Sequence, residues 1–254
     1  MNQLELREEA ITCSRKIKEA SLHTSPFKHT VIDNFLNADL ANKAMEAFPP
    51  LSDPCWEHSK DQGIEVKSRT AWTSEFDIPE DIIDVIRIVN SSLILTAMSD
   101  LFAIPKLMPD PYFSGGGLNV SEKNGHLDVH VDGNYHDASG LNRRMNLLIY
   151  LNPKWQEDWG GEFGIYTDDG NTLVKAVPPL FNRCVIFDSH DKSFHGLPNP
   201  INFPSNDPRR SIILYYYTKA DRPGEQVKIS EPHSALWRSK GMVDKRGNKT
   251  RKYS

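Results

Sequence analysis

Histidine and aspartate alternate in one short segment, and this pattern can bind a metal ion. Residues 126–132 read H-L-D-V-H-V-D. In a β-strand alternate residues share a face, so the two histidines and two aspartates would lie on one face and the aliphatic residues on the other. Four ionisable groups are costly to bury together without a cation. An H-x-D pair, such as His130 and Asp132, therefore predicts two ligands of one metal.

A third ligand has to come from another strand, and His195, which Gly196 follows, is the strongest candidate. Two imidazoles and one carboxylate occupy one face of an octahedron and leave three positions open, as in non-haem Fe(II) oxygenases. An α-keto acid can take two of these positions and O₂ the third. We therefore expect His130, Asp132 and His195 to be the metal ligands and the catalytic centre.

Such a co-substrate needs a cation for its far carboxylate. Arg209 and Ser211 open a strongly apolar strand and share a face by alternation. A guanidinium can bind the distal carboxylate of 2-oxoglutarate through two parallel hydrogen bonds, and a hydroxyl adds one more. The sequence thus predicts a 2-oxoglutarate clamp at Arg209 and Ser211.

The order of these motifs resembles the catalytic domain of the prolyl-4-hydroxylase-type iron and 2-oxoglutarate-dependent dioxygenases. The resemblance covers roughly residues 115–220, and more loosely 28–48. It is carried by five motifs in sequence order: His130-x-Asp132, Tyr150-Leu151-Asn152, Gly160-Gly161-Glu162-Phe163, His195-Gly196 and Arg209-x-Ser211. Each motif alone is weak, but all five in this order are specific.

The resemblance implies a double-stranded β-helix that binds Fe(II) through the three ligands named above. It implies that Arg209 binds the C5 carboxylate of 2-oxoglutarate with help from Ser211 and the Tyr150 hydroxyl. The implied reaction uses O₂, with ascorbate in a supporting role, to hydroxylate an unactivated C–H bond, with succinate and CO₂ as co-products. The implied substrate is a prolyl residue, a proline-like compound or another small metabolite, because fold does not choose among them.

Two alternative ligands compete with those chosen. His126 and Asp128 repeat the H-x-D pattern, but the resemblance favours the pair that precedes the polar stretch 133–142. His190 competes with His195, but it lies in a polar turn and is expected at the surface. Tyr150 could equally be a plain core residue, and Gly160-Gly161 is expected to serve a tight turn or bulge.

Arg144 and Tyr135 are candidate substrate contacts. Arg144 continues the face of Asn146, Leu148 and Tyr150 toward a loop, although it could instead pair with a nearby carboxylate. Two other functions remain open from the residues alone. One is a metal-binding jelly roll without catalytic activity, and the other is a zinc hydrolase on a cupin-like barrel, for which the same three ligands suffice.

The elements that position these residues follow from hydrophobic patterning. Residues 3–20 and 38–47 predict helices, the second capped by Asn37, and 31–36 predicts a strand. A longer helix is expected to start near Pro79 and to carry an apolar stripe from Ile82 to Leu93.

After Pro105 the apolar runs become short and rich in β-branched and aromatic residues. The expected strands are 117–121, 126–132, 144–151, 161–167, 172–177, 183–188 and 211–218. Their spacing predicts a mainly β jelly roll in an α+β chain. We expect a single domain over 1–254, with a helical and strand buttress (1–105), a catalytic core (106–220) and a basic extension (221–254).

Charge and cysteine content bound the remaining questions. The net charge is −4, which argues against a dedicated nucleic-acid binder, and no apolar run is long enough to cross a membrane. Residues 221–254 hold nine Lys or Arg against four Asp or Glu, which predicts either a solvated extension or an arm that docks on the core or meets a polyanion. Within it, the runs Trp237-Arg238-Ser239-Lys240 and Asp244-Lys245-Arg246-Gly247 could fold over the site or form an oligomer contact. Three scattered cysteines and an N-terminus without signal-peptide character favour a reducing, cytoplasmic location. The expected partner is a small-molecule or peptidyl substrate, and the oligomeric state is left open.

Overall fold

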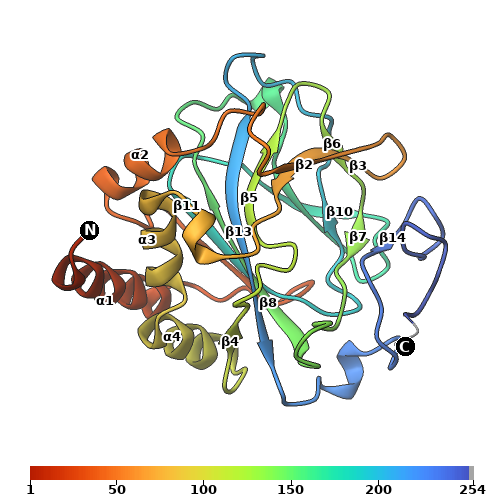
Figure 1. The fold of residues 1–254 in the computed structure, drawn as a ribbon. Helices are drawn as coiled ribbons and strands as arrows, with labels where there is room; N and C mark the ends of the chain where they lie inside the picture. Colours follow the sequence, from red (N-terminus) through yellow and green to blue (C-terminus); the bar gives the residue numbers. More distant parts are fainter. Residues whose placement is uncertain (252–254) are drawn as a thin grey trace.

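Two β-sheets form the centre of the molecule, and four helices lie against one of them (Figure 1). The computed structural model describes residues 1–251. The helices are α1 (Gln3–Glu19), α2 (Ala38–Glu46), α3 (Glu80–Val89) and α4 (Ser92–Phe102), with short 3-10 turns at Glu75–Asp77, Glu157–Trp159 and Gly224–Gln226. The strands are β1 (His29–Ile32), β2 (Trp56–Asp61), β3 (Glu65–Thr70), β4 (Met108–Pro109), β5 (Gly117–Ser121), β6 (His126–Leu127), β7 (His130–Val131), β8 (Asn142–Tyr150), β9 (Phe163–Tyr166), β10 (Leu173–Val177), β11 (Arg183–Asp188), β12 (His195–Gly196), β13 (Arg209–Thr218) and β14 (Leu236–Trp237).

The larger sheet has nine strands and is built around the antiparallel pair β8 and β13. Its main order is β1-β11-β8-β13-β5-β3-β2. Alternation along β8 places Leu148 and Tyr150 in a buried cluster with strands of the smaller sheet. The intervening Leu147 and Ile149 join the cluster that contains the helices. One face of this sheet therefore lines the interior between the sheets, and the other packs on the helices.

The smaller sheet has five strands in the order β10-β9-β12-β7-β14. It brings together parts of the chain that are far apart in sequence: His195 lies opposite His130, and Trp237 lies opposite His130 on the other side. Together the two sheets form the double-stranded β-helix that the sequence predicts, with the N-terminal helices as its buttress.

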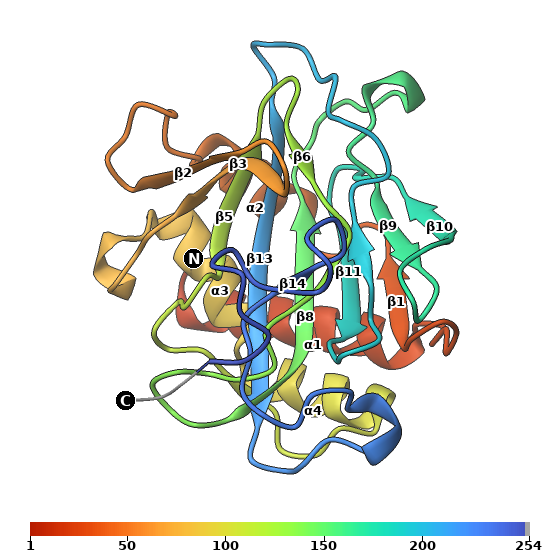
Figure 2. The same cartoon turned by 90° about the vertical axis from the view of Figure 1, so that its right-hand side faces the viewer.

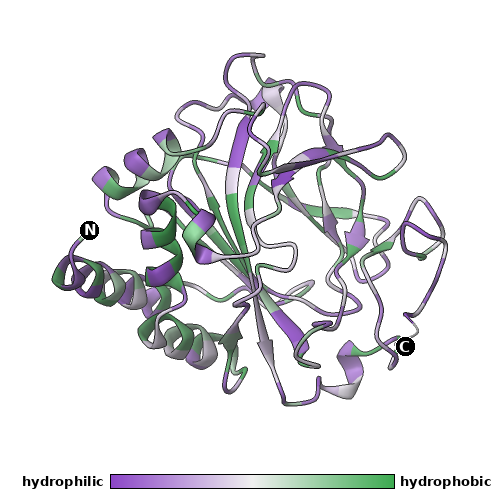
Figure 3. Ribbon diagram, viewed as in Figure 1, coloured by the Kyte–Doolittle hydropathy of each residue, from purple (hydrophilic) through white to green (hydrophobic). Residues whose placement is uncertain are grey.

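The helices pack through apolar faces on the larger sheet, as the hydropathy colouring of Figure 3 shows. Two of them have side-chain caps at their N-termini, and the cap of α2 is the one that the sequence predicts. Asn2 and Glu5 form a reciprocal capping box on α1, and the Asn37 side chain accepts the Leu40 N–H on α2. Within residues 1–251 no single helix is long and apolar enough to cross a membrane; α3 and α4 pass that test only together, bent by 47°.

Three expectations about elements were wrong. The predicted strand 126–132 is two strands, because β6 pairs with β3 in the larger sheet and β7 joins the smaller one. The long helix ends at Val89, where Asn90 and Ser91 separate α3 from α4, so Leu93 leaves the buried stripe and is 39% exposed. The first strand was expected over 31–36, but β1 begins two residues earlier, at His29, and ends at Ile32.

The basic extension docks on the core, although many of its residues stay exposed. We call residues 222–251 the C-terminal segment, and Figure 2 shows it, in dark blue, crossing the front of the molecule. Asp191 anchors it by accepting the N–H groups of Lys228 and Ile229 and by contacts to Arg222 and His233. Leu236 then packs in a small buried cluster against the smaller sheet. The last three residues of the predicted extension, 252–254, lie outside the described residues, and the proposed division into one domain of three parts stays a prediction.

Candidate active site

The three predicted metal ligands meet on the smaller sheet. Their potential ligand atoms all lie within 4.8 Å of one another. The Nε2 atom of His130 is 3.7 Å from Asp132 Oδ1, and that of His195 is 3.5 Å from Asp132 Oδ2. All three side chains are at least nine-tenths buried. Strand pairing explains the convergence, because β7 and β12 are neighbours with the two histidines in register.

Backbone carbonyls fix the orientation of both imidazoles. Nδ1 of His130 lies 2.9 Å from the Asp128 carbonyl, and Nδ1 of His195 lies 2.9 Å from the Ser193 carbonyl. A carbonyl only accepts, so each Nδ1 carries a proton and each Nε2 faces the site. This is the tautomer that a metal ligand needs, held by hydrogen bonds on the far side of the ring.

The electrostatics keep Asp132 charged and His195 neutral. Burial alone would raise the pKa of Asp132, but Arg143 and the two imidazoles hold it well below its usual value. Burial lowers the pKa of His195 to about 4, and His130 adds to this effect. A carboxylate and neutral imidazoles are the protonation states that bind a divalent metal.

Two side chains of β8 hold Asp132 in place. Asn146 Nδ2 donates to Asp132 Oδ2 over 2.7 Å, and an Arg143 Nη2 atom lies 3.2 Å from the same oxygen. Arg143 also donates to Asn146 Oδ1 and lies over the Tyr215 ring, with its guanidinium carbon 3.4 Å from the ring centroid. The other carboxylate oxygen, Oδ1, points toward His130, which leaves it available to a shared cation.

Arg209 is a buried cation with no ion-pair partner among residues 1–251. Its Nε donates to the Gly161 carbonyl over 2.8 Å, which fixes the side chain and leaves the two terminal nitrogens for a ligand. Its guanidinium carbon lies 5.0 Å from the Tyr150 ring centroid. Burial lowers the pKa of Arg209, as expected for a cation that awaits an anion.

Two buried hydroxyls beside Arg209 also lack hydrogen-bond partners in the described part of the chain. They belong to Tyr150 and Ser211, which lie opposite each other on β8 and β13. Burial raises the pKa of Tyr150, so its hydroxyl keeps its proton and can donate. One guanidinium and two unsatisfied hydroxyls form a recognition set for a carboxylate.

Gly161 lets the clamp residue approach closely. Its φ of +79° lies in the left-handed region, and a Cβ there would sit 2.9 Å from Arg209 Cδ. The Gly-Gly motif therefore does more than form the turn that the sequence predicts, since it also makes room for the clamp and supplies the carbonyl that orients it.

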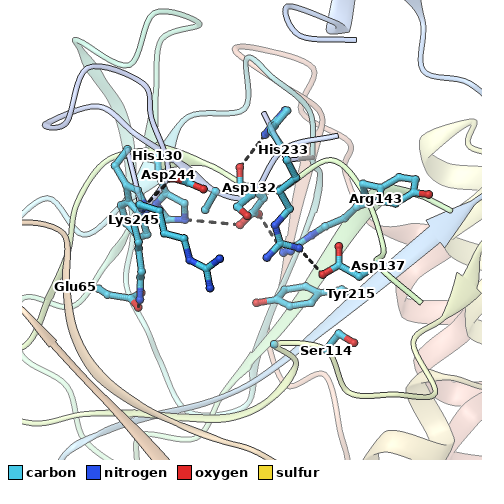
Figure 4. A pocket seen from close by; sticks show the side chains of 18 of the residues that line it. Glu65, Ser114, His130, Asp132, Asp137, Arg143, Tyr215, His233, Asp244 and Lys245 are labelled. Carbon is cyan, nitrogen blue, oxygen red and sulfur yellow. Dashed lines mark hydrogen bonds and ion pairs between the residues drawn. The ribbon is translucent and has the colours of Figure 1, made fainter. Parts of the chain in front are cut away.

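A large open cavity of about 1520 Å³ lies over His130 and Asp132 (Figure 4). One wall comes from the β2–β3 hairpin, and another comes from the C-terminal segment, including Trp237. The Trp237 indole stacks on the His130 ring, with centroids 4.5 Å apart and an interplanar angle of 28°. Trp237 is only 3% exposed, so it shields one face of this imidazole from water.

The remaining candidates lie apart from the three ligands. His126 sits on β6 in the other sheet, and the Asp128 carboxylate accepts the Ser239 N–H. His190 is not a surface residue as expected; it is 7% exposed, and burial lowers its pKa to about 4. Tyr135 lines the cavity, which is where its predicted contact with substrate requires it.

Arg144 is placed beside a carboxylate and not among the lining residues. Its Nε is 3.7 Å from Asp188 Oδ1, the alternative that the sequence left open. The lining residue is its neighbour Arg143, because a register irregularity on the β8–β13 ladder turns that side chain into the cavity. Sequence reasoning missed Arg143. The run that begins with Trp237 was expected to fold over the site or to form an oligomer contact, and the structure places Trp237 at the site.

The residues present fit Fe(II) and 2-oxoglutarate. The two oriented imidazoles and the carboxylate form the donor set of a non-haem Fe(II) site. The unpaired guanidinium with its two unsatisfied hydroxyls fits the far end of a dicarboxylate. Both groups of residues face the interior between the sheets.

Comparison with known proteins supports this reading of the site. Residues 116–217 match the family model described as the 2OG-Fe(II) oxygenase superfamily, a range that includes all five motifs. In sequence, 86 residues are 30% identical to prolyl 3-hydroxylase OGFOD1 of Mus musculus. This match covers 32% of the chain and only 15% of the mouse protein.

Two solved structures share the fold. A prolyl hydroxylase from Trichoplax adhaerens, in complex with a hypoxia inducible factor peptide fragment, aligns with a TM-score of 0.58 at 16% identity over 85% of this chain and 94% of that one. A Pseudomonas putida prolyl-4-hydroxylase aligns with a TM-score of 0.56 at 16% identity over 83% of this chain and 99% of that one. Residues 116–217 are thus similar to the 2OG-Fe(II) oxygenase superfamily in sequence, and the chain shares its fold with these two prolyl hydroxylases.

Proposed function

We propose that the protein is an Fe(II)- and 2-oxoglutarate-dependent oxygenase that hydroxylates a prolyl residue of a polypeptide. The observation that carries this proposal is the pairing of a three-ligand site with a buried arginine that makes no ion pair with residues 1–251. A metal-binding module alone needs no such cation, and a hydrolase has no use for it. The family match supports the same reaction class.

Each residue has a distinct role in this proposal. His130, Asp132 and His195 would hold Fe(II), which supplies the O₂ and C–H chemistry when it is bound together with 2-oxoglutarate. Arg209, Tyr150 and Ser211 bind and orient the distal carboxylate of the co-substrate. Asn146 and Arg143 hold the Asp132 carboxylate, and Trp237 keeps water from one side of His130.

The choice of a prolyl substrate rests on the sequence match to a prolyl 3-hydroxylase. The size of the cavity supports a polypeptide over a free amino acid, because sites for small molecules usually measure ~300–1,000 Å³. Within this proposal, the lining residue Tyr135 is a substrate contact. Arg144, which pairs with Asp188, is assigned to supporting the β8 strand.

A coupled turnover assay tests the function. The protein is incubated with Fe(II), 2-oxoglutarate, ascorbate and O₂ in the presence of a library of proline-containing peptides. We expect succinate and a mass gain of one oxygen atom in a subset of peptides, in equal amounts, and neither with His130→Ala. Succinate no higher than in His130→Ala across the whole library would contradict the proposal.

We also propose a reducing, cytoplasmic environment for the protein. Cys13, Cys55 and Cys184 are all unpaired, which is what such an environment maintains. Fractionation of the native cells, followed by immunodetection, tests this; recovery from an oxidising compartment would refute it.

A further inference from the structure

The cavity over the metal site carries positive charge, although the protein as a whole has a net charge of −4. Seven Lys or Arg side chains line it against five Asp or Glu. Four of the seven belong to the C-terminal segment: Lys245, Arg246, Lys249 and Arg251. This segment lies outside the stretch that matches the family model. Six of the seven basic lining side chains, all but Arg143, therefore lie outside the stretch that matches the family model.

The acidic residues of the cavity are already held by other groups. Glu57 pairs with Arg69, Glu65 with Lys67 and Lys245, Asp132 with Arg143, Asp137 with Arg251, and Asp244 accepts backbone N–H groups of the same turn.

Arg246 and Lys249 differ from the other bases. Both side chains are exposed, and neither has a hydrogen bond or ion pair with residues 1–251. These two cations are free to meet an anionic ligand.

The wall that carries these cations is firmly placed. Ser239 Oγ donates to the Gly63 carbonyl at the tip of the β2–β3 hairpin, and Lys240 lies 3.1 Å from Asp61. Asp191 holds the start of the segment, and β14 pairs with β7 beside His130. The hairpin and this wall therefore border the same cavity over His130 and Asp132.

The geometry favours a polypeptide as the anionic ligand. The cavity is larger than a free amino acid needs and is open to solvent. Carboxylates are interleaved with the bases along its walls, so the continuous charge of a nucleic-acid backbone would meet repulsion, whereas a peptide can present isolated acidic side chains. The net negative charge of the whole chain also disfavours a polynucleotide.

We propose that the C-terminal segment selects polypeptide substrates that carry acidic residues near the target residue, through Arg246 and Lys249. This inference rests on the proposed function and deepens it by naming the substrate class. Exposed charge pairs are individually weak, so two of them together are expected to change peptide affinity by about tenfold at low ionic strength and by much less at high salt.

Peptide binding tests the inference without turnover. The protein is loaded with Fe(II) and 2-oxoglutarate under anaerobic conditions, and three fluorescent peptides of equal length are titrated by anisotropy. Each peptide has one central proline flanked by Glu, Gln or Lys. The variant is Arg246→Glu/Lys249→Glu. The matched control is Lys18→Glu/Lys154→Glu, which changes net charge equally at two exposed lysines away from the cavity.

We expect the Glu peptide to bind about tenfold more tightly than the Lys peptide, with the difference shrinking at high salt. The cavity variant should lose or invert this preference, and the control should keep it. The inference is overturned if the Gln or Lys peptide binds as well as the Glu peptide, if the cavity variant keeps the preference, if no peptide binds, or if a single-stranded oligonucleotide binds more tightly than the Glu peptide.

Failure of the inference is separable from failure of the proposed function. Addition of 2-oxoglutarate to the anaerobic Fe(II) protein should produce a weak visible charge-transfer band. If the band appears while the peptide preference does not, only the inference fails. If the band is absent, the proposed function itself fails.

Discussion

Replacement of Arg209 by methionine should separate co-substrate binding from folding. Arg209 is 7% exposed and lacks an ion-pair partner in the described residues, so its charge adds a desolvation cost to the protein without its ligand. Methionine has a similar length and removes that cost. We therefore expect Arg209→Met to be as stable as the wild type, or more stable, when 2-oxoglutarate is absent.

The loss of co-substrate affinity should be large. Removal of one partner of a buried, hydrogen-bonded ion pair costs about 3–5 kcal/mol. This corresponds to a Kd for 2-oxoglutarate that is raised by roughly 10²–10³-fold or more. The Tyr150 and Ser211 hydroxyls remain in the variant, which places the expected effect near the lower end of that range.

Thermal unfolding of the anaerobic Fe(II) protein measures both effects. At a 2-oxoglutarate concentration of 100 times the wild-type Kd, the wild type should gain about 2.7 kcal/mol, and the variant should gain less than about 0.5 kcal/mol. In a chain of this size these values correspond to Tm shifts of roughly 5–11 °C and at most about 2 °C.

Arg210→Met is the matched control, because Arg210 lies on the opposite face of β13 and pairs with Asp207. It should leave the co-substrate shift intact. A full shift in Arg209→Met, or an equal loss in Arg210→Met, would refute the reasoning about the clamp.

Three further predictions concern the surroundings of the site. Gly161→Ala should raise the Kd for 2-oxoglutarate by about tenfold in a calorimetric titration, because the added Cβ would lie 2.9 Å from Arg209 Cδ. Gly241→Ala is the control: Gly241 has a similar φ with open space around it, so this change should leave the Kd unchanged. Fe(II) should quench tryptophan fluorescence in the wild type but far less in Trp237→Phe, since Trp237 stacks on the imidazole of the ligand His130. Trp155→Phe is the control and should be quenched like the wild type; equal quenching in the two variants would be inconsistent with the stacking contact. Burial alone would raise the pKa of Asp191, but His233 and two backbone N–H groups lower it to about 2. The ionised Asp191 therefore stabilises the fold above pH 4, and this contribution of about 2 kcal/mol is lost as the pH falls toward 2. Urea unfolding should show the wild-type advantage over Asp191→Asn shrinking from pH 5 to pH 3, and a constant advantage would contradict this.

Local patterning was sufficient where a buried strand stays in one sheet over its whole length. Strands β5 and β11 have the predicted bounds, and alternation along β13 does place Arg209 and Ser211 on one face. At 126–132 the alternation is clear in the sequence, but it does not reveal that the chain passes from one sheet to the other between His126–Leu127 and His130–Val131. The β2–β3 hairpin was missed for a related reason: its strands are rich in charged residues and have little apolar alternation.

The contacts around the ligands depend on tertiary structure that one sequence does not display. Arg143, rather than Arg144, reaches Asp132 because of an irregularity in strand register. Trp237 reaches His130 only because a segment rich in Lys and Arg returns to the sheet, although its charge is typical of a solvated tail. Both features arise from nonlocal strand pairing.

Anaerobic titration with Fe(II) and 2-oxoglutarate tests the central claim most directly. The wild type should bind one equivalent of Fe(II) and develop a visible charge-transfer band when 2-oxoglutarate is added. His195→Ala should bind Fe(II) far more weakly and show no band, while His126→Ala, whose imidazole lies in the other sheet, should behave as the wild type. A band that survives His195→Ala, or one that vanishes in His126→Ala, would contradict the assignment of the metal ligands.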